Sequence, residues 1–189
     1  NWPQIYPLGF LPLIEPHIID SSATLGVRGT KSAWFWDLSG QYGHNSFEFN
    51  VVDSLNVSLG PNVPPNQTDF YAGTLQFNHM LLNADARREF EVGLAGPLNV
   101  AVGAEARREN YQIQAGEEAS YASGGFRDRN GAIAPIGAQV FPGFRPSIEV
   151  DTSRNSVAGY VDLEGDLVSR LRVGVAGRFE HYDDFGDTL

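Results

Sequence analysis

The segment NSVAGYVDLEGDLVSRLRVGVAGRFEHYDD, residues 155–184, alternates between apolar and polar side chains in both of its halves. Val161 and Leu163 share one parity in the first half, and Val173 and Val175 do the same in the second half. Charged residues occupy most of the intervening positions. Side chains of a strand point alternately to its two faces, so this period of two predicts two strands rather than a helix. A short polar stretch between the halves predicts a hairpin.

Two environments produce such a hairpin. In an ordinary antiparallel sheet the apolar face packs on a core and the charged face meets water. In an outer-membrane barrel the apolar face meets lipid and the charged face lines the lumen. The hairpin alone does not choose between them.

Composition narrows the class of protein. The 189 residues include no cysteine, which excludes a disulfide framework and a thiolate metal site. The net charge of −10 and the pI of about 4.7 argue against a nucleic-acid partner. No apolar run is long enough for a membrane-spanning helix. The chain opens in a proline-rich stretch without a signal peptide, and we expect it to be a fragment.

The same alternation recurs upstream and extends far. From Ser32 it lasts roughly 20 residues, whereas typical globular strands have about 5 or 6 and a membrane crossing needs about 9 to 11. Trp34 and Trp36 lie beside an expected turn, and Tyr42 lies about 20 Å further along the same face at a tilt near 40°. That separation approaches the height of an apolar membrane band with an aromatic girdle at each rim, although a core aromatic cluster would give the same pattern.

One strand changes phase. Leu75 and Phe77 are apolar at odd positions, whereas Ala84 and Ala86 are apolar at even positions. A one-residue slip would move every side chain to the other face, so the change around residues 80–82 predicts a bulge or a break.

Long loops and short turns alternate along the sequence. The expected long loops are residues 1–17, 53–69 and 116–151, and the expected short turns are residues 30–32, 93–97 and 165–170. Short turns at one rim and long loops at the other are typical of transmembrane barrels. The sequence therefore predicts an all-β fold, an antiparallel up-and-down meander of about six long strands that is a fragment of a large transmembrane β-barrel.

Several runs resemble one family. They are GVRGT (residues 26–30), WFWDLSGQYGHNSFEF (34–49), DARREFEVGLAGPLNVAVGAEARRE (85–109), GAEARRENYQIQAGEEASY (103–121), GAQVFPGF (137–144), SRNSVAGYVDLEGDL (153–167) and AGRFEHYDDFGDT (176–188). Together they resemble the barrel domain of TonB-dependent outer-membrane receptors. The likeness covers nearly all of the chain after about residue 16, and it consists of strand and turn signatures that are silent on the ligand.

The resemblance implies a 22-stranded barrel closed by a plug domain, with uptake energised by the TonB complex through the plug. The expected cargo is a scarce nutrient such as an iron chelate, a vitamin or a carbohydrate. The expected partners are the plug, the remaining barrel strands, the lipid bilayer and an unknown small-molecule ligand, and the location is the cell outer membrane. The chain departs from the pattern in lacking a plug, a TonB box and an aromatic-ended last strand, so residues 1–189 correspond to the middle of a barrel domain. The alternatives are a soluble all-β binding module and a passive porin-like channel.

The two faces supply the candidate site residues. The candidate lumen-facing residues, which would contact the plug, are Arg28, Glu105, Arg107, Glu109, Asp162, Glu164, Arg172, Arg178 and Glu180. The candidate lipid-facing residues are Trp34, Trp36, Leu38, Tyr42, Val100, Val102, Val161, Leu163, Val173 and Val175. On the alternative interpretation the charged residues form the solvated face of a soluble sheet.

Enzyme chemistry has little support in the sequence. Asp37, His44 and Ser46 occupy one strand without the mutual geometry of a catalytic triad. His181 is near Asp183 and Asp184, but their spacing matches no ligand scheme for a metal. We therefore expect no catalytic residues, no metal and no cofactor.

Overall fold

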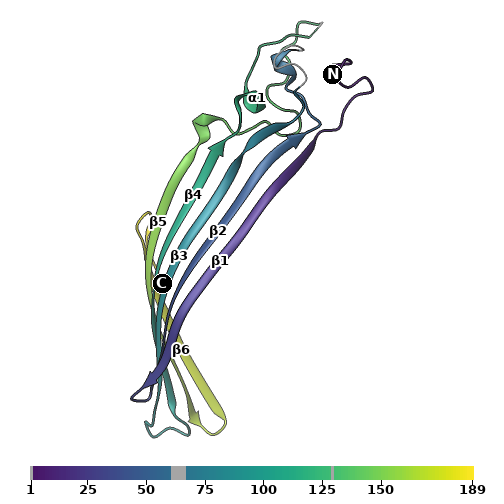
Figure 1. The fold of residues 1–189 in the computed structure, drawn as a ribbon. Helices are drawn as coiled ribbons and strands as arrows, with labels where there is room; N and C mark the ends of the chain where they lie inside the picture. Colours follow the sequence, from purple (N-terminus) through teal and green to yellow (C-terminus); the bar gives the residue numbers. More distant parts are fainter. Residues whose placement is uncertain (1, 61–66, 129) are drawn as a thin grey trace. The chain divides into compact units, whose positions relative to one another are not determined.

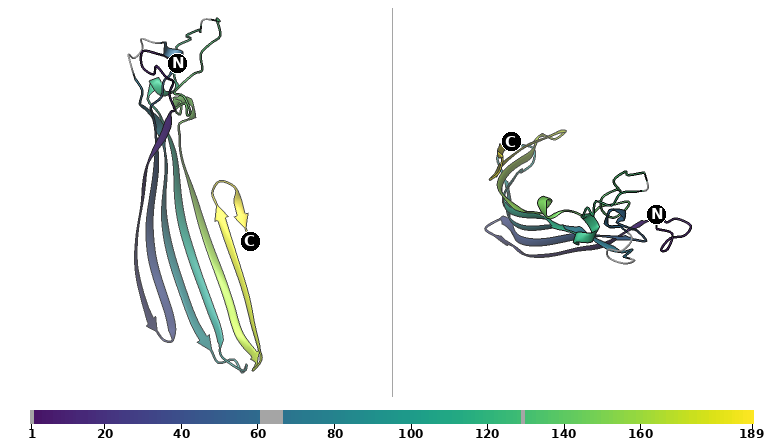
Figure 2. Two further views of the ribbon diagram at one scale, coloured as in Figure 1. Left: turned by 90° about the vertical axis from the view of Figure 1, so that its right-hand side faces the viewer. Right: turned by 90° about the horizontal axis from the view of Figure 1, so that it is seen from above.

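The computed structural model describes residues 2–60, 67–128 and 130–189. Within them, seven strands form one sheet in the order of the sequence, each pairing with its chain neighbours (Figures 1 and 2). They are β1 (Leu13–Lys31), β2 (Trp34–Val52), β3 (Phe70–Phe90), β4 (Leu98–Ala115), β5 (Val150–Val168), β6 (Leu171–Tyr182) and β7 (Gly186–Thr188). Strands β1 and β7 are the edges, so the sheet is open. The predicted all-β, antiparallel up-and-down meander of about six long strands is confirmed, with the three-residue β7 added.

Within the described residues, helical structure is limited to short turns in the long connections. The structure has a 3₁₀ turn at Val57–Leu59, helix α1 at Glu118–Tyr121 and a 3₁₀ turn at Pro146–Ile148. The long connections are residues 53–69 and 116–149, the second ending two residues before the expected 151. The sheet is therefore the main architecture, and its connections carry the irregular backbone.

Strand β1 begins at Leu13, inside the segment 1–17 that we expected to be a loop. Pro16 suggested a loop because proline lacks a backbone N–H group. At the edge of a sheet, however, an N–H group can face away from the neighbouring strand, so proline is tolerated there.

Two of the short turns are tighter than the sequence predicted, and the third is longer. Ser32 and Ala33 join β1 to β2, in place of the expected 30–32, and both have positive φ, 51° and 66°. Two consecutive positive φ values are the requirement of a type I′ hairpin turn. Residues 169–170 join β5 to β6, in place of 165–170, because Gly165 and Asp166 still pair with β6 before a register shift. The connection between β3 and β4 spans 91–97 rather than 93–97.

Strand β3 passes through residues 80–82 without interruption, so the predicted bulge or break there was wrong. The ring of His79 fills the space where a Cβ on Gly43 would lie, and Arg87 stacks over Phe35 at 4.8 Å. Gly43 and Phe35 have the same parity in β2, so His79 and Arg87 lie on one face of β3. The apolar residues change face along this strand while the backbone keeps its alternation.

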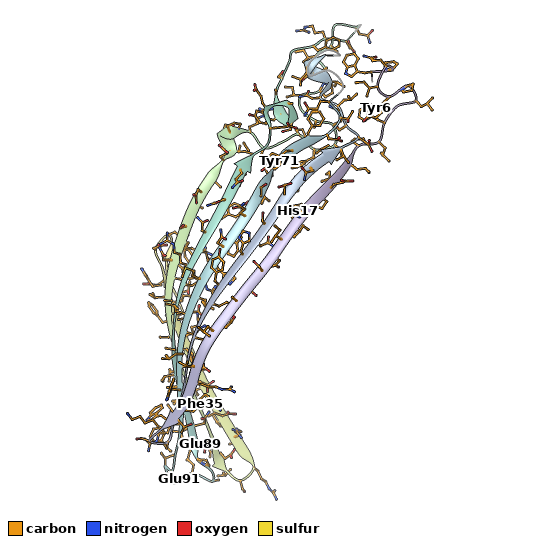
Figure 3. All side chains as sticks on the ribbon, in the orientation of Figure 1. Tyr6, His17, Phe35, Tyr71, Glu89 and Glu91 are labelled. Carbon is orange, nitrogen blue, oxygen red and sulfur yellow. The ribbon has the colours of Figure 1, made fainter. Side chains whose placement is uncertain are left out.

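The chain divides into two compact units. Unit 1 comprises Asn1–Asp20, His44–Phe77 and Tyr111–Thr152, and it contains both long connections. Unit 2 comprises Ser21–Gly43, Asn78–Asn110 and Ser153–Leu189, and it contains the three short turns. Figure 3 labels Tyr6, His17 and Tyr71 in unit 1 and Phe35, Glu89 and Glu91 in unit 2.

A small apolar core in unit 1 packs one of the long connections against the strands. Val51, Phe70 and Ala72 from the ends of β2 and β3 are buried against Ala138 of the 116–149 connection. Phe141 of the same connection stacks on the ring of Phe49 at 5.0 Å between centroids. The connection thus folds back onto the strands that precede it.

Buried polar groups fasten the two long connections of unit 1 together. The Asn56 amide donates to the carbonyl oxygens of Ala119 and Ala122 at 2.7 and 2.9 Å, and its Oδ1 accepts from Ser58 Oγ at 2.6 Å. Asn56 is 5% exposed, so little water reaches this side chain. Loss of the Asn56 amide would remove hydrogen bonds from carbonyl oxygens that little water reaches, which is costly in a protein interior.

We predict that Asn56→Ala loosens the 116–149 connection. The Ala119 carbonyl oxygen would lose the Asn56 donor and the Ala122 carbonyl oxygen would keep only the bond from Ser58 Oγ, which should cost about 1–3 kcal/mol of local stability. Hydrogen-exchange mass spectrometry should show faster exchange across residues 116–126. Gln114→Ala, which removes an exposed amide of the same unit, is the matched control and should leave that exchange unchanged. Equal exchange in both variants would contradict the role assigned to Asn56.

Candidate functional site

The strands of unit 2 have two faces of opposite character. Along β4, Val102 and Ala104 are exposed and alternate with the less exposed Gly103 and Glu105. Along β5 the same alternation holds, with Val161 43% exposed. We call the face that carries Glu105 the charged face and the face that carries Val102 and Val161 the apolar face.

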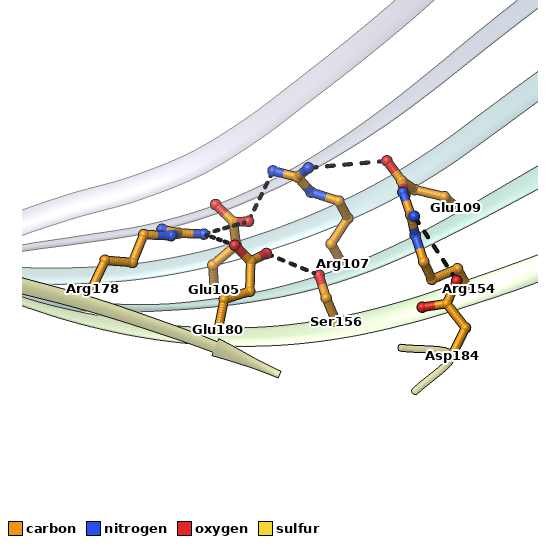
Figure 4. Close-up of polar contacts among 8 residues, drawn as sticks. All are labelled: Glu105, Arg107, Glu109, Arg154, Ser156, Arg178, Glu180 and Asp184. Atoms are coloured by element: carbon orange, nitrogen blue, oxygen red, sulfur yellow. Dashed lines mark hydrogen bonds and ion pairs between the residues drawn. The ribbon is translucent and has the colours of Figure 1, made fainter. Parts of the chain in front are cut away.

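The charged face brings five of the predicted residues into one network, drawn in Figure 4. Arg107 pairs with Glu105 at 2.9 Å and with Glu109 at 3.9 Å. Arg178 pairs with Glu105 at 3.2 Å and with Glu180 at 3.5 Å. Charges from β4 and β6 therefore meet across β5.

The sequence interpretation missed three members of this network. Arg154 donates through Nε to Glu109 at 3.0 Å and lies 3.9 Å from Asp184, and Ser156 donates to Glu180 at 3.3 Å. Arg154 and Ser156 have the parity of Asp162 in β5. Extending the alternation of β5 toward its start would have identified both residues.

The other predicted charged residues lie outside the network. Glu164 and Arg172 form their own pair at 2.7 Å, between facing strands β5 and β6. Arg28 and Asp162 take part in none of these ion pairs. The nine candidate lumen-facing residues therefore divide into a network of five, a separate pair, and two residues that belong to neither.

On the charged face, the side chain of Tyr160 extends from β5 over Gly103 of β4 to reach β3. The Tyr160 hydroxyl of β5 donates to Asp85 Oδ1 of β3 at 2.7 Å, passing over β4. A Cβ at Gly103 of β4 would lie 2.1 Å from the Tyr160 ring and 2.4 Å from Asp85 Oδ1. Only glycine leaves room for this bond, which ties three neighbouring strands together.

The ion pairs arrange charge more than they stabilise the sheet. Exposed pairs contribute about 0–1 kcal/mol each because water screens them. Glu105, Glu109 and Glu180 are only 16%, 18% and 13% exposed, so these carboxylates are better sheltered than the arginines that meet them. The result is a face of fixed, alternating charge that suits contact with a polar partner.

The apolar face has no covering layer among the described residues. Leu25 is 83% exposed, Leu82 60% and Val175 65%. The pairing of β5 with β6 places Leu163 opposite Val175, so predicted lipid-facing residues of the two strands are neighbours. Trp34 contacts Phe90 edge to face at 6.0 Å, at the end of the face nearest the short turns. Soluble monomers rarely expose many neighbouring apolar side chains on one face.

A row of polar side chains crosses the apolar face, and the sequence did not reveal it. The Tyr42 hydroxyl donates to Asn78 Oδ1 at 3.1 Å, Asn78 Nδ2 donates to Asn110 Oδ1 at 3.5 Å, and Asn110 Nδ2 donates to Ser153 Oγ at 3.1 Å. These residues come from β2, β3, β4 and β5 in turn, and we call them the polar row. Their parity matches that of the apolar residues on each strand, so the row limits the apolar face at the end away from the short turns.

Unit 1 contains a recess of about 800 Å³ between the N-terminal segment and the 116–149 connection. Trp2 and Phe126 meet there edge to face, with ring centroids 5.1 Å apart. Gln4 and Arg127 add polar groups to the lining. We call this feature the loop recess, and its mixed aromatic and polar lining is typical of small-molecule sites.

His181 and Asp183, which the sequence analysis considered as possible metal ligands, form hydrogen bonds with other residues. His181 bonds to Asp187 at 2.6 Å, while Asp183 accepts two hydrogen bonds from Asn155, at 3.0 and 2.7 Å. Those bonds hold the pKa of the Asp183 carboxyl below its usual range. Among the described residues no group of three His, Cys, Asp or Glu side chains is placed to hold a metal ion.

No helix within the described ranges is long and apolar enough to span a lipid bilayer.

Comparison with known proteins found no match to this chain among protein-family models, curated proteins or solved structures.

We predict that Tyr160→Phe destabilises unit 2 by about 1.5 kcal/mol, the lower end of the range for a hydrogen bond to a charged group. The loss arises because Asp85 keeps its charge but loses its donor. Urea titration of Tyr160→Phe, Asp85→Asn and the double variant measures the coupling between the two side chains. Strictly additive effects of the two substitutions would show that the bond contributes nothing.

Proposed function

We propose that this chain forms part of the wall of a β-barrel in the cell outer membrane, within a TonB-dependent receptor that takes up a scarce nutrient. On this proposal the apolar face of unit 2 contacts lipid and the charged face looks into the lumen. The edge strands β1 and β7 pair with further strands of the same barrel. The loop recess of unit 1 contributes to the capture of the nutrient.

The observation that carries the proposal is the uncovered apolar face. Along β4 it comprises Leu98, Val100, Val102, Ala104 and Ala106. These positions span about 26 Å of strand, or about 20 Å across a membrane at a tilt near 40°, against an apolar band about 25 Å tall in outer-membrane barrels. Trp34 and Phe90 at one end and Tyr42 at the other match the aromatic girdles of such barrels.

The charged face fits a lumen that is filled by protein. The arginines and carboxylates of its network are paired with one another, so they offer a polar partner both donors and acceptors in fixed positions. On this proposal, that partner is the plug domain that the resemblance to TonB-dependent receptors implies. The long connections of unit 1 support the receptor interpretation, because ligand-binding residues are commonly found on loops held by a rigid scaffold.

We predict that the two faces respond differently to charge. In the full-length protein that carries this chain, Val161→Arg should cost about 2–4 kcal/mol, the range for an arginine facing lipid near the middle of a membrane. Asp162→Asn, at the next position on the charged face, should be mild. Urea unfolding of both variants in lipid vesicles gives the comparison. If Val161→Arg is tolerated as well as Asp162→Asn, the assignment of the faces is wrong.

Cell fractionation separates the proposed receptor from its alternatives. The full-length protein should enter the outer-membrane fraction and migrate differently on gels before and after heating, because folded barrels resist detergent. A soluble binding module would remain in the soluble fraction and refold without detergent. In planar bilayers a plugged receptor should show no steady conductance, whereas a porin-like channel would conduct.

A further inference from the structure

Arg108 is exposed on the apolar face of β4, two residues before Asn110 of the polar row. The arginines of unit 2 that form ion pairs, such as Arg107 and Arg154, lie on the charged face. Among the described residues no carboxylate lies within ion-pair distance of Arg108. An arginine so placed offers its charge to something outside the chain.

A shallow groove of about 700 Å³ adjoins Arg108 on the same face. Small side chains form its floor and larger apolar side chains its walls. Among the lining residues are Leu38, Gly40, Leu82, Ala84, Ala104 and Ala106. Its exposed surface is almost entirely apolar, and its lining residue Ala106 lies two positions before Arg108 on this face of β4. The groove matches a hydrocarbon chain rather than a water-soluble ligand.

We infer that Arg108, the polar row and this groove together bind an anionic lipid. The Arg108 guanidinium pairs with the lipid phosphate, Tyr42 and Asn110 face the polar head group, and one acyl chain lies in the groove. The inference rests on the proposed function, because it requires the apolar face to meet a bilayer. It adds a chemically specific partner and places the border between hydrocarbon and head groups at the polar row.

Charge complementarity supports a lipid phosphate as the occupant. The chain carries a net charge of −10, so attraction of an anion must come from a local basic group. Guanidinium binds phosphate through two parallel hydrogen bonds, and its aliphatic stem can cover apolar surface while the charge reaches the head-group layer. Arg88 has the same parity near the opposite end of the apolar face, but its guanidinium stacks on Phe90 at 4.8 Å. Arg108 has no such aromatic partner within the described part of the chain and is the better anion site.

The test compares the full-length protein in nanodiscs of phosphatidylglycerol and of phosphatidylcholine. Native mass spectrometry of the released protein counts the lipids that remain bound. We expect about a fivefold preference for phosphatidylglycerol, the factor for one basic residue near an anionic surface. Arg108→Gln should abolish the preference and Arg108→Lys should keep most of it. Arg107→Gln removes the same charge one residue away on the charged face and should leave the preference unchanged.

A second variant separates a lipid from free phosphate. Ala106→Phe fills the groove while keeping Arg108, so it should reduce the number of retained phosphatidylglycerol molecules. Unchanged retention in Ala106→Phe would show that Arg108 binds phosphate without an acyl chain, which overturns the lipid assignment. A preference that survives Arg108→Gln, or that is lost in Arg107→Gln, overturns the site. Failure of the unsubstituted protein to insert into either nanodisc refutes the membrane wall itself, and that result is distinct from insertion without lipid preference.

Discussion

The alternation of side chains along long antiparallel strands is the constraint on which this protein depends. Strands β1 to β5 have between 18 and 21 residues, and each must present one parity to each side of the sheet. In unit 2 this places Val102 and Val161 on one side and Glu105 and Tyr160 on the other. Because the backbone hydrogen bonds of the inner strands run between neighbouring strands, either face of the sheet can meet any solvent without leaving those backbone groups unpaired. The side chains alone decide which solvent each face meets.

The charged face shows how a sheet accommodates many ionic side chains without a core beneath them. Carboxylates of β4 and β6 share arginines across the sheet, and Tyr160 bridges to Asp85 over a glycine. No single contact here is strong, since each is partly open to water. Their collective effect is to hold charges in fixed positions, which is the property that a surface in contact with a folded partner requires.

Unit 1 is organised by different physics. The connections there have an apolar core around Val51 and Phe70, and buried amide and hydroxyl groups such as those of Asn56 and Ser58 satisfy the irregular backbone. At Gly143 a Cβ would lie 1.9 Å from Ser120 Oγ, so the backbone at residue 143 can approach Ser120 this closely only because residue 143 is glycine. Long loops without such contacts would remain conformationally free. The described parts of the two loops contact one another, and a binding surface built on them is partly formed before a ligand arrives.

The change of phase in β3 marks where the side chains meet different surroundings. Leu75 and Phe77 are apolar at odd positions in unit 1, whereas Met80 and Leu82 are apolar at even positions in unit 2. We interpreted the change as a defect in the strand, but the contacts of His79 and Arg87 show that the alternation continues. Periodicity reports the environment of a side chain as well as the geometry of the backbone, and one strand can pass through two environments.

The sequence by itself determined the all-β class, a meander of about six long antiparallel strands, and the parity of most charged and apolar residues. These features are local, because a period of two is visible within a few residues. Only the tertiary structure decided which of those residues meet. Partners such as Tyr42 and Asn78 are 36 residues apart, and Ser54 reaches Gln139 across 85 residues. Such contacts depend on the register between strands and on loop closure, and neither leaves a periodic signal in the chain.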